Sequence, residues 1–268
     1  MKYLFTILLL CTYVYANDLQ LKSQLSEASP GSYVVTEQAK SCALLYIREK
    51  VDNLLVIEEI SIPFSNFTRQ KMSWRQWFEI GAPGHTLWTV SQINLDTGVF
   101  EETYSYTHQG WVDMSDSNSF LCQLLNLNFS KIPICERKRV GLPPGVNKKD
   151  NRPIWNPRVF IDGVQQTNIP FSAYKARWHR DNSELSCKVI NIYLPESNTE
   201  NYPTFFPYLV EVEGKVANVK LRIIDAGIEA RSARQPFSLK APELNEEPFW
   251  SEEGLTFKMK INNSAYST

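Results

Sequence analysis

Hydrophobic and polar residues alternate along this chain, most regularly in its second half. Apolar side chains occupy every second position over residues 217–223 and again over residues 255–261. Because successive side chains of a strand point to opposite faces of a sheet, this period of two predicts strands with one buried and one solvated face. In the second stretch, the apolar side chains at odd positions from Leu255 to Ile261 are expected to be buried.

Further stretches have the composition of short strands, and no strand–helix–strand rhythm connects them. These strands are expected at Tyr33–Thr36, Cys42–Arg48, Leu54–Ile62, Lys188–Leu194 and Tyr208–Glu213. Strands with one solvated face are typical of antiparallel sheets. The sequence therefore predicts a mainly β protein, with a twisted antiparallel sheet that is half-barrel or barrel-like and a few short helices.

Three short helices are predicted beside these strands. They are expected over residues 19–28, 74–80 and 119–126. Asp18 is placed to cap the first helix. Ser73 and Gln76 have the spacing of a capping box at the start of the second. Gly81 and Pro83 should end that helix, because neither favours helical continuation.

A hairpin is predicted around residues 96–98. A three-residue loop would pair Val90 with Tyr104 and, next to the turn, Leu95 with Val99. This register gathers large apolar side chains on one face and threonine and serine on the other, whereas a two-residue loop would mix them. Since a slip of one residue reverses the facing of a strand, we expect the three-residue loop.

The N-terminal residues have the composition of an export signal. Lys2 precedes an uncharged, mostly apolar run, Tyr3–Tyr15, and Ala16 ends a cleavage site with small residues. We expect a signal peptide over residues 1–16 and an exported protein, periplasmic or secreted. Lipid attachment at Cys11 is the alternative, which the bulky residue before it disfavours. No other stretch is apolar enough to predict a transmembrane span in the mature chain.

A segment rich in proline and basic residues, 137–157, separates the two sets of strands. Its composition is that of a loop. Because short strands flank it on both sides, we expect residues 17–268 to form a single, mainly antiparallel β domain. The alternative is two domains, 17–136 and 153–268, joined by a linker over residues 137–152.

This segment also holds the strongest local concentration of positive charge. Its basic residues, with the arginine that follows it, are Arg137, Lys138, Arg139, Lys148, Lys149, Arg152 and Arg158. The whole chain is almost neutral, with 28 Lys+Arg against 29 Asp+Glu, which argues against a globally basic nucleic-acid-binding protein. A local anion site for phospholipid head groups or a polyanionic polymer is therefore predicted, with a solvated loop as the alternative. Its expected ligands are Arg137, Lys138, Arg139, Lys148 and Lys149.

Aromatic residues make up 12% of the chain and concentrate in two stretches. Trp74, Trp77 and Trp88 surround a Gly- and Pro-rich turn, and Phe205 and Phe206 lie between prolines. Such clusters line apolar cavities or carbohydrate platforms, and they also fill ordinary cores. We take these five residues as candidate ligand-binding residues, with core packing as the alternative.

The sequence contains none of the common hydrolase motifs. H-E-x-x-H and G-x-S-x-G are both absent, and there are three histidines, His85, His108 and His179. The expected hairpin register sends His85 and His108 to opposite faces, which removes them as joint metal ligands. We therefore predict no catalytic residues, no metal site and no cofactor, although a triad assembled from distant residues stays open.

Four cysteines remain when the expected signal peptide is removed. Cys122 and Cys135 enclose a short loop and could form a disulfide in an oxidising compartment. The alternative is free thiols that behave as small apolar residues, as could also hold for Cys42 and Cys187. The sequence does not choose between them.

Two strings, 73–85 and 222–227, are similar to stretches in uncharacterised exported bacterial proteins, a resemblance that carries no known activity. The alternating strands resemble the antiparallel half-barrels of lipoprotein-carrier proteins at the level of the fold. These features favour a non-enzymatic binding protein for an apolar or amphiphilic ligand, a lipid or acyl chain, with no nucleic-acid partner. The alternatives are an envelope or cell-wall hydrolase, or a secreted interaction protein that uses the basic loop 137–158. The oligomeric state is not determined.

Overall fold

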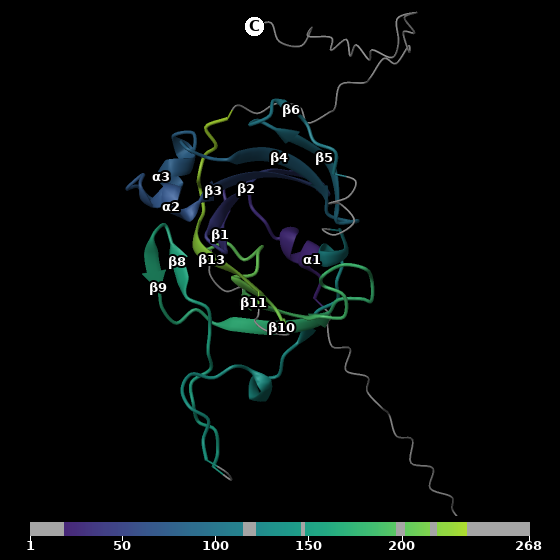
Figure 1. Ribbon diagram of the computed structural model, residues 1–268, viewed down its shortest axis with the longest axis vertical. Helices are drawn as coiled ribbons and strands as arrows, with labels where there is room; N and C mark the ends of the chain where they lie inside the picture. The colour runs from purple at the N-terminus through teal and green to yellow at the C-terminus, as the bar shows by residue number, and fades with distance from the viewer. Residues whose placement is uncertain (1–18, 115–121, 146–147, 197–201, 215–218, 235–268) are drawn as a thin grey trace, which may run out of the picture.

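The computed structural model describes residues 19–114, 122–145, 148–196, 202–214 and 219–234. It is a mainly β protein, as predicted, with thirteen strands in one sheet and a few short helices (Figure 1). The predicted strand over residues 255–261 and the expected signal peptide over residues 1–16 lie outside the described residues. Within the described part, no helix has the length and apolar content needed to cross a membrane.

The strands of the sheet come from both halves of the chain. They are β1 (Tyr33–Gln38), β2 (Ser41–Val51), β3 (Leu54–Pro63), β4 (Leu87–Asn94), β5 (Val99–Ser105), β6 (Gly110–Trp111), β7 (Ser130–Lys131), β8 (Val159–Ile161), β9 (Val164–Gln166), β10 (Phe171–Arg177), β11 (Val189–Pro195), β12 (Leu209–Val212) and β13 (Val219–Gly227). The helices are α1 (Leu21–Leu25), α2 (Phe64–Thr68) and α3 (Trp74–Glu79), with a short helical stretch over residues 122–125 and the 3-10 helix η1 (Ile134–Glu136). The predicted strands that fall on described residues are present within a few residues of their expected ends.

The sheet order is β6-β5-β4-β3-β2-β1-β13-β12-β11-β10-β7, and β8 and β9 lie beside β13. All pairs are antiparallel except β13 with β8, which meet in parallel at Ala226 and Ile161. β1 joins the two halves, because it pairs with β2 on one side and β13 on the other. Over the described residues, the edge strands β6 and β7 do not pair with each other, so the sheet is an open half-barrel.

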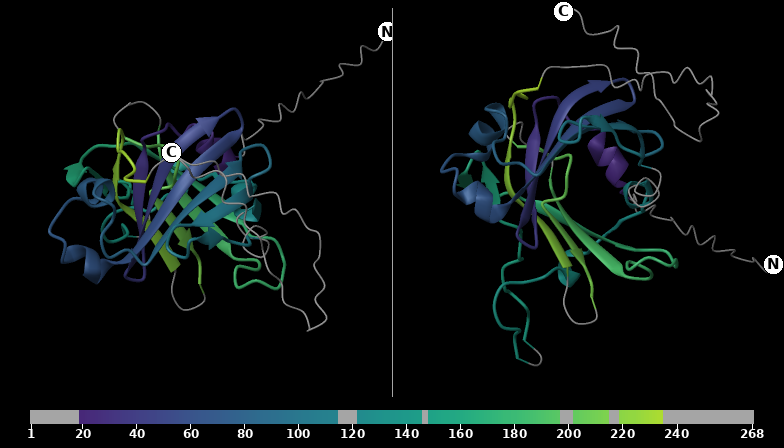
Figure 2. Two further views of the ribbon diagram at one scale, coloured as in Figure 1. Left: turned by 90° about the horizontal axis from the view of Figure 1, so that it is seen from above. Right: turned by 45° about the horizontal axis from the view of Figure 1, so that its top comes forward.

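The sheet curves around α1. In Figures 1 and 2, α1 lies inside the curve, whereas α2, α3 and the β8–β9 hairpin lie outside it. We call the two sides the inner and outer faces. On β2, Leu44 packs in the same buried cluster as Trp77 of α3, while Ile47 packs in the cluster that holds Leu25 of α1. Both faces of this part of the sheet are therefore covered.

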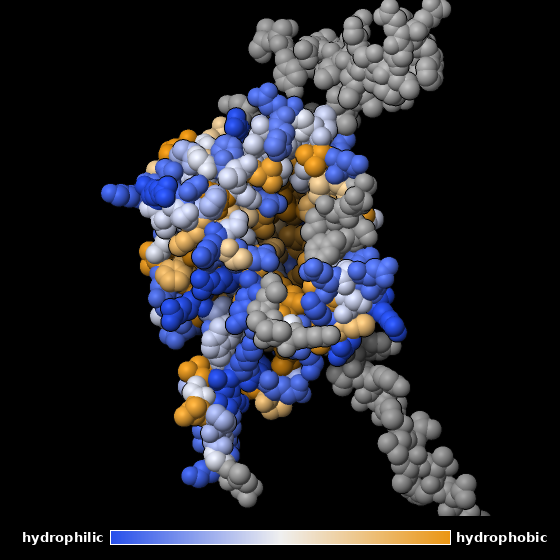
Figure 3. All heavy atoms as spheres, in the orientation of Figure 1, coloured by the Kyte–Doolittle hydropathy of each residue, from blue (hydrophilic) through white to orange (hydrophobic). Residues whose placement is uncertain are grey.

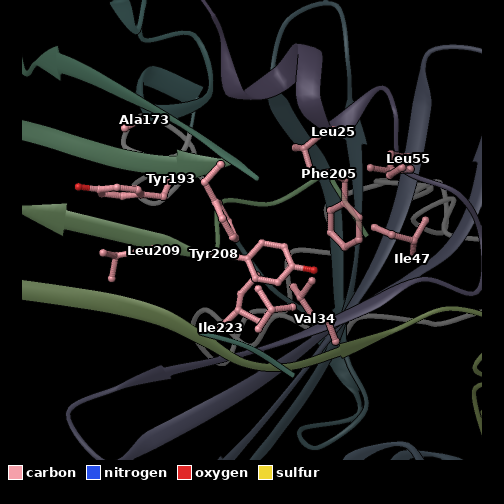
Figure 4. Packing of buried hydrophobic residues seen from close by; sticks show 14 of the residues in the cluster. Leu25, Val34, Ile47, Leu55, Ala173, Tyr193, Phe205, Tyr208, Leu209 and Ile223 are labelled. Carbon is pink, nitrogen blue, oxygen red and sulfur yellow. The ribbon is translucent and has the colours of Figure 1, made fainter. Parts of the chain in front are cut away.

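The inner cluster joins the two arms of the curve. Figure 4 shows Phe205 beside Leu25, and Tyr208 beside Ile223 and Val34. Tyr208 is 1% exposed, and its hydroxyl donates a hydrogen bond to the Pro203 carbonyl oxygen at 3.0 Å. Because its polar end is bonded within the segment 202–208, the ring can be buried without leaving an unsatisfied hydroxyl.

The capping box predicted for α3 is confirmed. The Ser73 hydroxyl accepts a hydrogen bond from the backbone N–H of Gln76 at 3.2 Å, and the Gln76 side chain accepts one from the Ser73 N–H. Gly81 follows the helix at φ +98°, a conformation that favours glycine. α1 differs from its prediction, because its N-cap is Gln20 and makes no side-chain capping bond. The third predicted helix is described from residue 122 onward, and residues 122–125 are helical.

The β4–β5 hairpin follows the predicted register only in its body. Val90 pairs with Tyr104, as the separation of apolar and hydroxyl side chains requires. Next to the turn the prediction is wrong, because Asn94 rather than Leu95 lies opposite Val99. The register shifts by one residue between Gln92 and Ile93, so the body of the hairpin and its turn follow different pairings.

Side-chain hydrogen bonds at the turn explain this difference. The Asn94 side-chain oxygen accepts hydrogen bonds from the backbone N–H groups of Asp96 and Thr97, at 3.0 and 3.3 Å. Gly98 has φ +74° and donates its N–H to the Asn94 carbonyl oxygen at 2.7 Å. These contacts close a four-residue loop, and such local turn chemistry does not appear in a hydrophobic pattern.

The four cysteines of the described residues are free thiols. Cys122 is half-buried, with its sulfur 3.5 Å from the Thr97 carbonyl oxygen, and Cys135 is exposed in η1. The Cys122–Cys135 disulfide that the sequence allowed is therefore not formed in the structure. Cys42 is buried, and that burial raises the pKa of its thiol to about 12, which makes it chemically inert.

Candidate functional site

The inner face of β3 is open to a hollow inside the curve. Leu55 of β3 packs in the same cluster as Leu25 of α1, which places this side of β3 inside. Alternate side chains share a face, so Ile57 and Glu59 point inward as well. Leu45 of β2 pairs with Glu59 and therefore lies on the same face. Leu45 and Ile57 are only partly buried.

Hydroxyl side chains continue this face on β4 and β5. Thr89 and Ser91 of β4 pair with inward-facing residues of β3, and Ser105 and Thr103 of β5 pair with them in turn. The Ser91 and Thr103 hydroxyls are 2.9 Å apart and bond to each other. All four residues are buried, so this part of the inner face is polar and uncharged but largely covered.

Glu59 is the one charged residue on the inner face over residues 43–47, 55–61 and 87–93. Its side chain is exposed and forms no hydrogen bond or ion pair with any described residue. The surrounding protein desolvates this carboxyl and raises its pKa above the usual range. Figure 3 shows the hollow from the open side of the curve, with hydrophobic residues at its base.

The five predicted aromatic ligand residues fall on opposite faces of the sheet. Trp74, Trp77 and Trp88 pack together in the outer cluster under α2 and α3. Phe205 is buried in the inner cluster, and Phe206 packs against it. The structure therefore does not bring the five together, and only the two phenylalanines are on the side of the hollow.

A carboxylate network, buried at Tyr33 and Asp225 and exposed at Asp162, ties α3 to β13. Arg75 forms a bidentate ion pair with Asp162, at 2.7 and 2.8 Å. The Tyr33 hydroxyl lies 2.9 Å from an Asp162 oxygen and 3.2 Å from an Asp225 oxygen, and Asp225 also accepts the Gly163 N–H at 2.9 Å. Arg75 and Asp225, from the two strings 73–85 and 222–227, are thus linked through this network.

Gly227 is required beside that network. A Cβ at this position would lie 2.5 Å from the Tyr33 ring and 2.8 Å from an Asp162 oxygen, closer than any real contact. The ring of Tyr33 occupies the space that a side chain would take. Gly227 has this structural role, which does not require a ligand.

Asp225 makes the stability of the protein depend on pH. Its burial raises the pKa of the carboxyl from 3.8 to about 6. The folded state therefore holds this proton more tightly than the unfolded state, and stability falls as pH rises from about 4 to about 6, by about 3 kcal/mol. We expect Asp225→Asn to remove this part of the decline, measured by urea denaturation across that range. An unchanged pH dependence in the variant would contradict the assignment.

His85 belongs to the packing of the outer face. Its Nδ1 lies 2.8 Å from the Ala82 carbonyl oxygen, and its ring meets Trp88 edge-on with centroids 5.5 Å apart. Among the described residues, no three His, Cys, Asp or Glu side chains are grouped as metal ligands would be. His179 lies on a different part of the chain, where it contacts Asp181 at 3.0 Å.

The predicted anion residues are partly brought together. Arg137, Lys138 and Arg139 line a pocket of about 1020 Å³, whereas Lys148 and Lys149 are not among its lining residues. The pocket recruits residues that the local charge pattern missed, because they come from a distant strand, β13. They are Lys220 and Arg222, with Trp155 as an aromatic neighbour.

The fold thus defines an open antiparallel half-barrel with a helix in its curve and a basic pocket on its outer side. Residues 43–167 match the family model described as CT021 protein. Among solved structures, the hypothetical protein CT021 from Chlamydia trachomatis is similar, with a TM-score of 0.59 and 19% sequence identity. The similarity covers 83% of this chain and 98% of that chain and shows a shared fold. No curated protein matches the sequence.

Proposed function

We propose that this is an exported, non-enzymatic binding protein whose hollow shelters the apolar part of an amphiphile, such as a lipid or acyl chain. The observation that carries the proposal is the inner face itself. Leu45 and Ile57 are only partly buried there, beside the buried hydroxyl side chains of β4 and β5 and one charged residue. Covering such aliphatic surface with an acyl chain is favourable by roughly 0.8 kcal/mol per buried CH₂ group.

Glu59 gives the proposed ligand a polar contact. It is exposed within the hollow and has no partner among the described residues, so a hydroxyl or amine of an amphiphile can donate to it. Aliphatic side chains with one convergent polar group are typical of sites that bind small apolar molecules. The export expected from the N-terminal sequence is part of the same proposal, because envelope lipids require carriers in water.

The proposal predicts that Ile57→Asn weakens binding of a fluorescent fatty acid, cis-parinaric acid, by about tenfold. The variant places an unsatisfied amide against the acyl chain of the probe. Val56→Asn is the matched control. Val56 neighbours Ile57 on the same strand and is also half-buried, but it faces the outer side. Its affinity for the probe should stay within about twofold of the wild type.

Native mass spectrometry with organic extraction tests the same proposal without a chosen probe. Protein purified under mild conditions should carry extractable lipid, and the Ile57→Asn protein should carry less than the Val56→Asn protein. Protein that contains no lipid and binds no probe would overturn the proposal.

A further inference from the structure

The outer side of the sheet carries the basic pocket, opposite the hollow. Val210 of β12 packs in the same cluster as Leu21 of α1, so it faces inward. Its neighbours Leu209 and Glu211 therefore lie on the other face of β12, although Leu209 is also part of the large cluster that contains Leu25. Leu209 lines the pocket, and Glu211 forms an ion pair with the lining residue Lys138. Residues from 137–139 and 152–158 form the other wall.

Seven cationic side chains line the pocket, and among the described residues three carboxylates contact them. The seven are Arg137, Lys138, Arg139, Arg152, Arg158, Lys220 and Arg222. Glu211 is shared by Lys138 and by Lys220, the latter at 3.4 Å. Glu37 pairs with Arg222 at 2.7 Å. Asp150 is shared by Arg152 and Arg139, and the hydrogen bonds from Arg152 lower the pKa of Asp150 to about 2. The positive charge of the pocket is thus only partly compensated.

Arg137 is fixed in place without being neutralised. Its guanidinium donates to the Phe171 carbonyl oxygen at 2.7 Å and to the Asn156 side-chain oxygen at 2.8 Å. Its Nε is buried and has no hydrogen-bond partner among the described residues. Arg158 is exposed and forms no ion pair with the described part of the chain. Two arginines therefore retain their charge for a ligand.

Apolar side chains form the rest of the lining. Trp155 stands edge-on to Tyr193, with ring centroids 5.4 Å apart, and Phe160, Leu209 and Ile224 lie around the same space. A bare inorganic ion would leave this surface uncovered. A volume of about 1020 Å³ instead suits a ligand with both a charged group and an organic body.

We propose that this pocket binds an organic phosphate, with the phosphate held by Arg137 and Arg158 and the organic part against Trp155. Guanidinium groups match phosphate oxygens with two parallel hydrogen bonds, which favours phosphate over a monovalent anion. The ligand is either a phospholipid head group or a soluble phosphate ester, because both present the same chemistry. The pocket includes Tyr208 and Ile223 of the cluster that holds Leu25, but none of Leu45, Ile57 and Glu59. The proposal therefore does not depend on the proposed function.

Two probes distinguish the sources. Calorimetry with glycerol phosphate measures a soluble ester, and co-sedimentation with phosphatidylcholine vesicles, with and without phosphatidylglycerol, measures a membrane surface. Binding to the soluble probe assigns a phosphate ester, whereas binding only to the anionic vesicles assigns a lipid head group. Either result supports the site, and binding to neither probe overturns it.

Charge-removing variants locate the binding. Arg158→Gln should weaken the binding that is observed by about tenfold, because one charge-assisted contact is lost. Lys220→Gln, on the opposite wall, should also weaken it. Arg180→Gln is the matched control, since Arg180 is exposed and is not among the pocket residues. Equal effects of all three variants would show general charge attraction and overturn the proposed pocket site.

Ile57→Asn should leave phosphate binding unchanged, which separates this test from that of the hollow.

Discussion

Arg48→Ala is expected to lower the free energy of unfolding by about 3 to 5 kcal/mol, because it leaves a buried carboxylate without its cation. Glu58 is 0% exposed and forms an ion pair with Arg48, whose side chain is 12% exposed. Two neutral donors remain in the variant, the Trp88 indole N–H and the Ser232 hydroxyl, each 2.9 Å from the second carboxylate oxygen. They do not replace the lost positive charge.

The pH dependence identifies the cause of that loss. Burial already raises the pKa of Glu58, and removing Arg48 raises it further in the folded state only. Protonation of Glu58 then removes its unpaired charge. The loss of stability in Arg48→Ala should therefore be larger at neutral pH than at about pH 5. Glu58→Gln in the Arg48→Ala background should recover part of the stability. Urea denaturation measures all three proteins, and a loss below about 1 kcal/mol would mean that water reaches Glu58.

Trp77→Ala is expected to cost about 3 to 5 kcal/mol, since it removes a large buried ring and leaves a cavity under α3. Trp77 is 0% exposed and meets Trp74 and Phe67 edge-on, with centroids 5.6 and 5.9 Å apart. Its indole N–H donates to the Pro83 carbonyl oxygen at 2.9 Å, which satisfies the one polar group of the ring. Thermal and urea denaturation give the change in stability.

Matched variants decide whether Trp77 serves the core alone. Trp77→Phe keeps most of the ring volume and should cost less than Trp77→Ala. Ile80 directly follows α3 and is 62% exposed. Ile80→Ala should therefore have little effect on the free energy of unfolding. If Trp77 is a core residue, Trp77→Phe also leaves fatty-acid binding unchanged. A selective loss of that binding would instead make Trp77 a ligand contact, as the aromatic pattern allowed.

Local features of the fold were predictable because their causes lie within a few residues. The period-two pattern located β13, the composition of short strands located β2, β3 and β11, and Ser73 with Gln76 marked the start of α3. The hairpin shows the limit of this reasoning. Apolar segregation set the pairing of Val90 with Tyr104, but the bonds of Asn94 changed the pairing at the turn.

The candidate sites depended much more on long-range contacts. The charge pattern indicated Arg137 and its neighbours, yet the pocket also needs Lys220 and Arg222 from β13. The aromatic pattern made Trp88 and Phe205 candidates for the same kind of ligand site, although they lie in different clusters on opposite sides of the sheet. Sequence spacing carries no information on which face of a curved sheet each residue will occupy.

The sequence by itself determined the strands, the fold class and the capping of α3, because alternation and capping act over two to four residues. The tertiary structure alone decided the pairing of β1 with β13, which closes the two halves into one curved sheet. It also decided that Glu59 faces a hollow and that seven cations meet on the outer side. Those outcomes follow from strand order and sheet curvature, which arise from contacts between residues far apart in the chain.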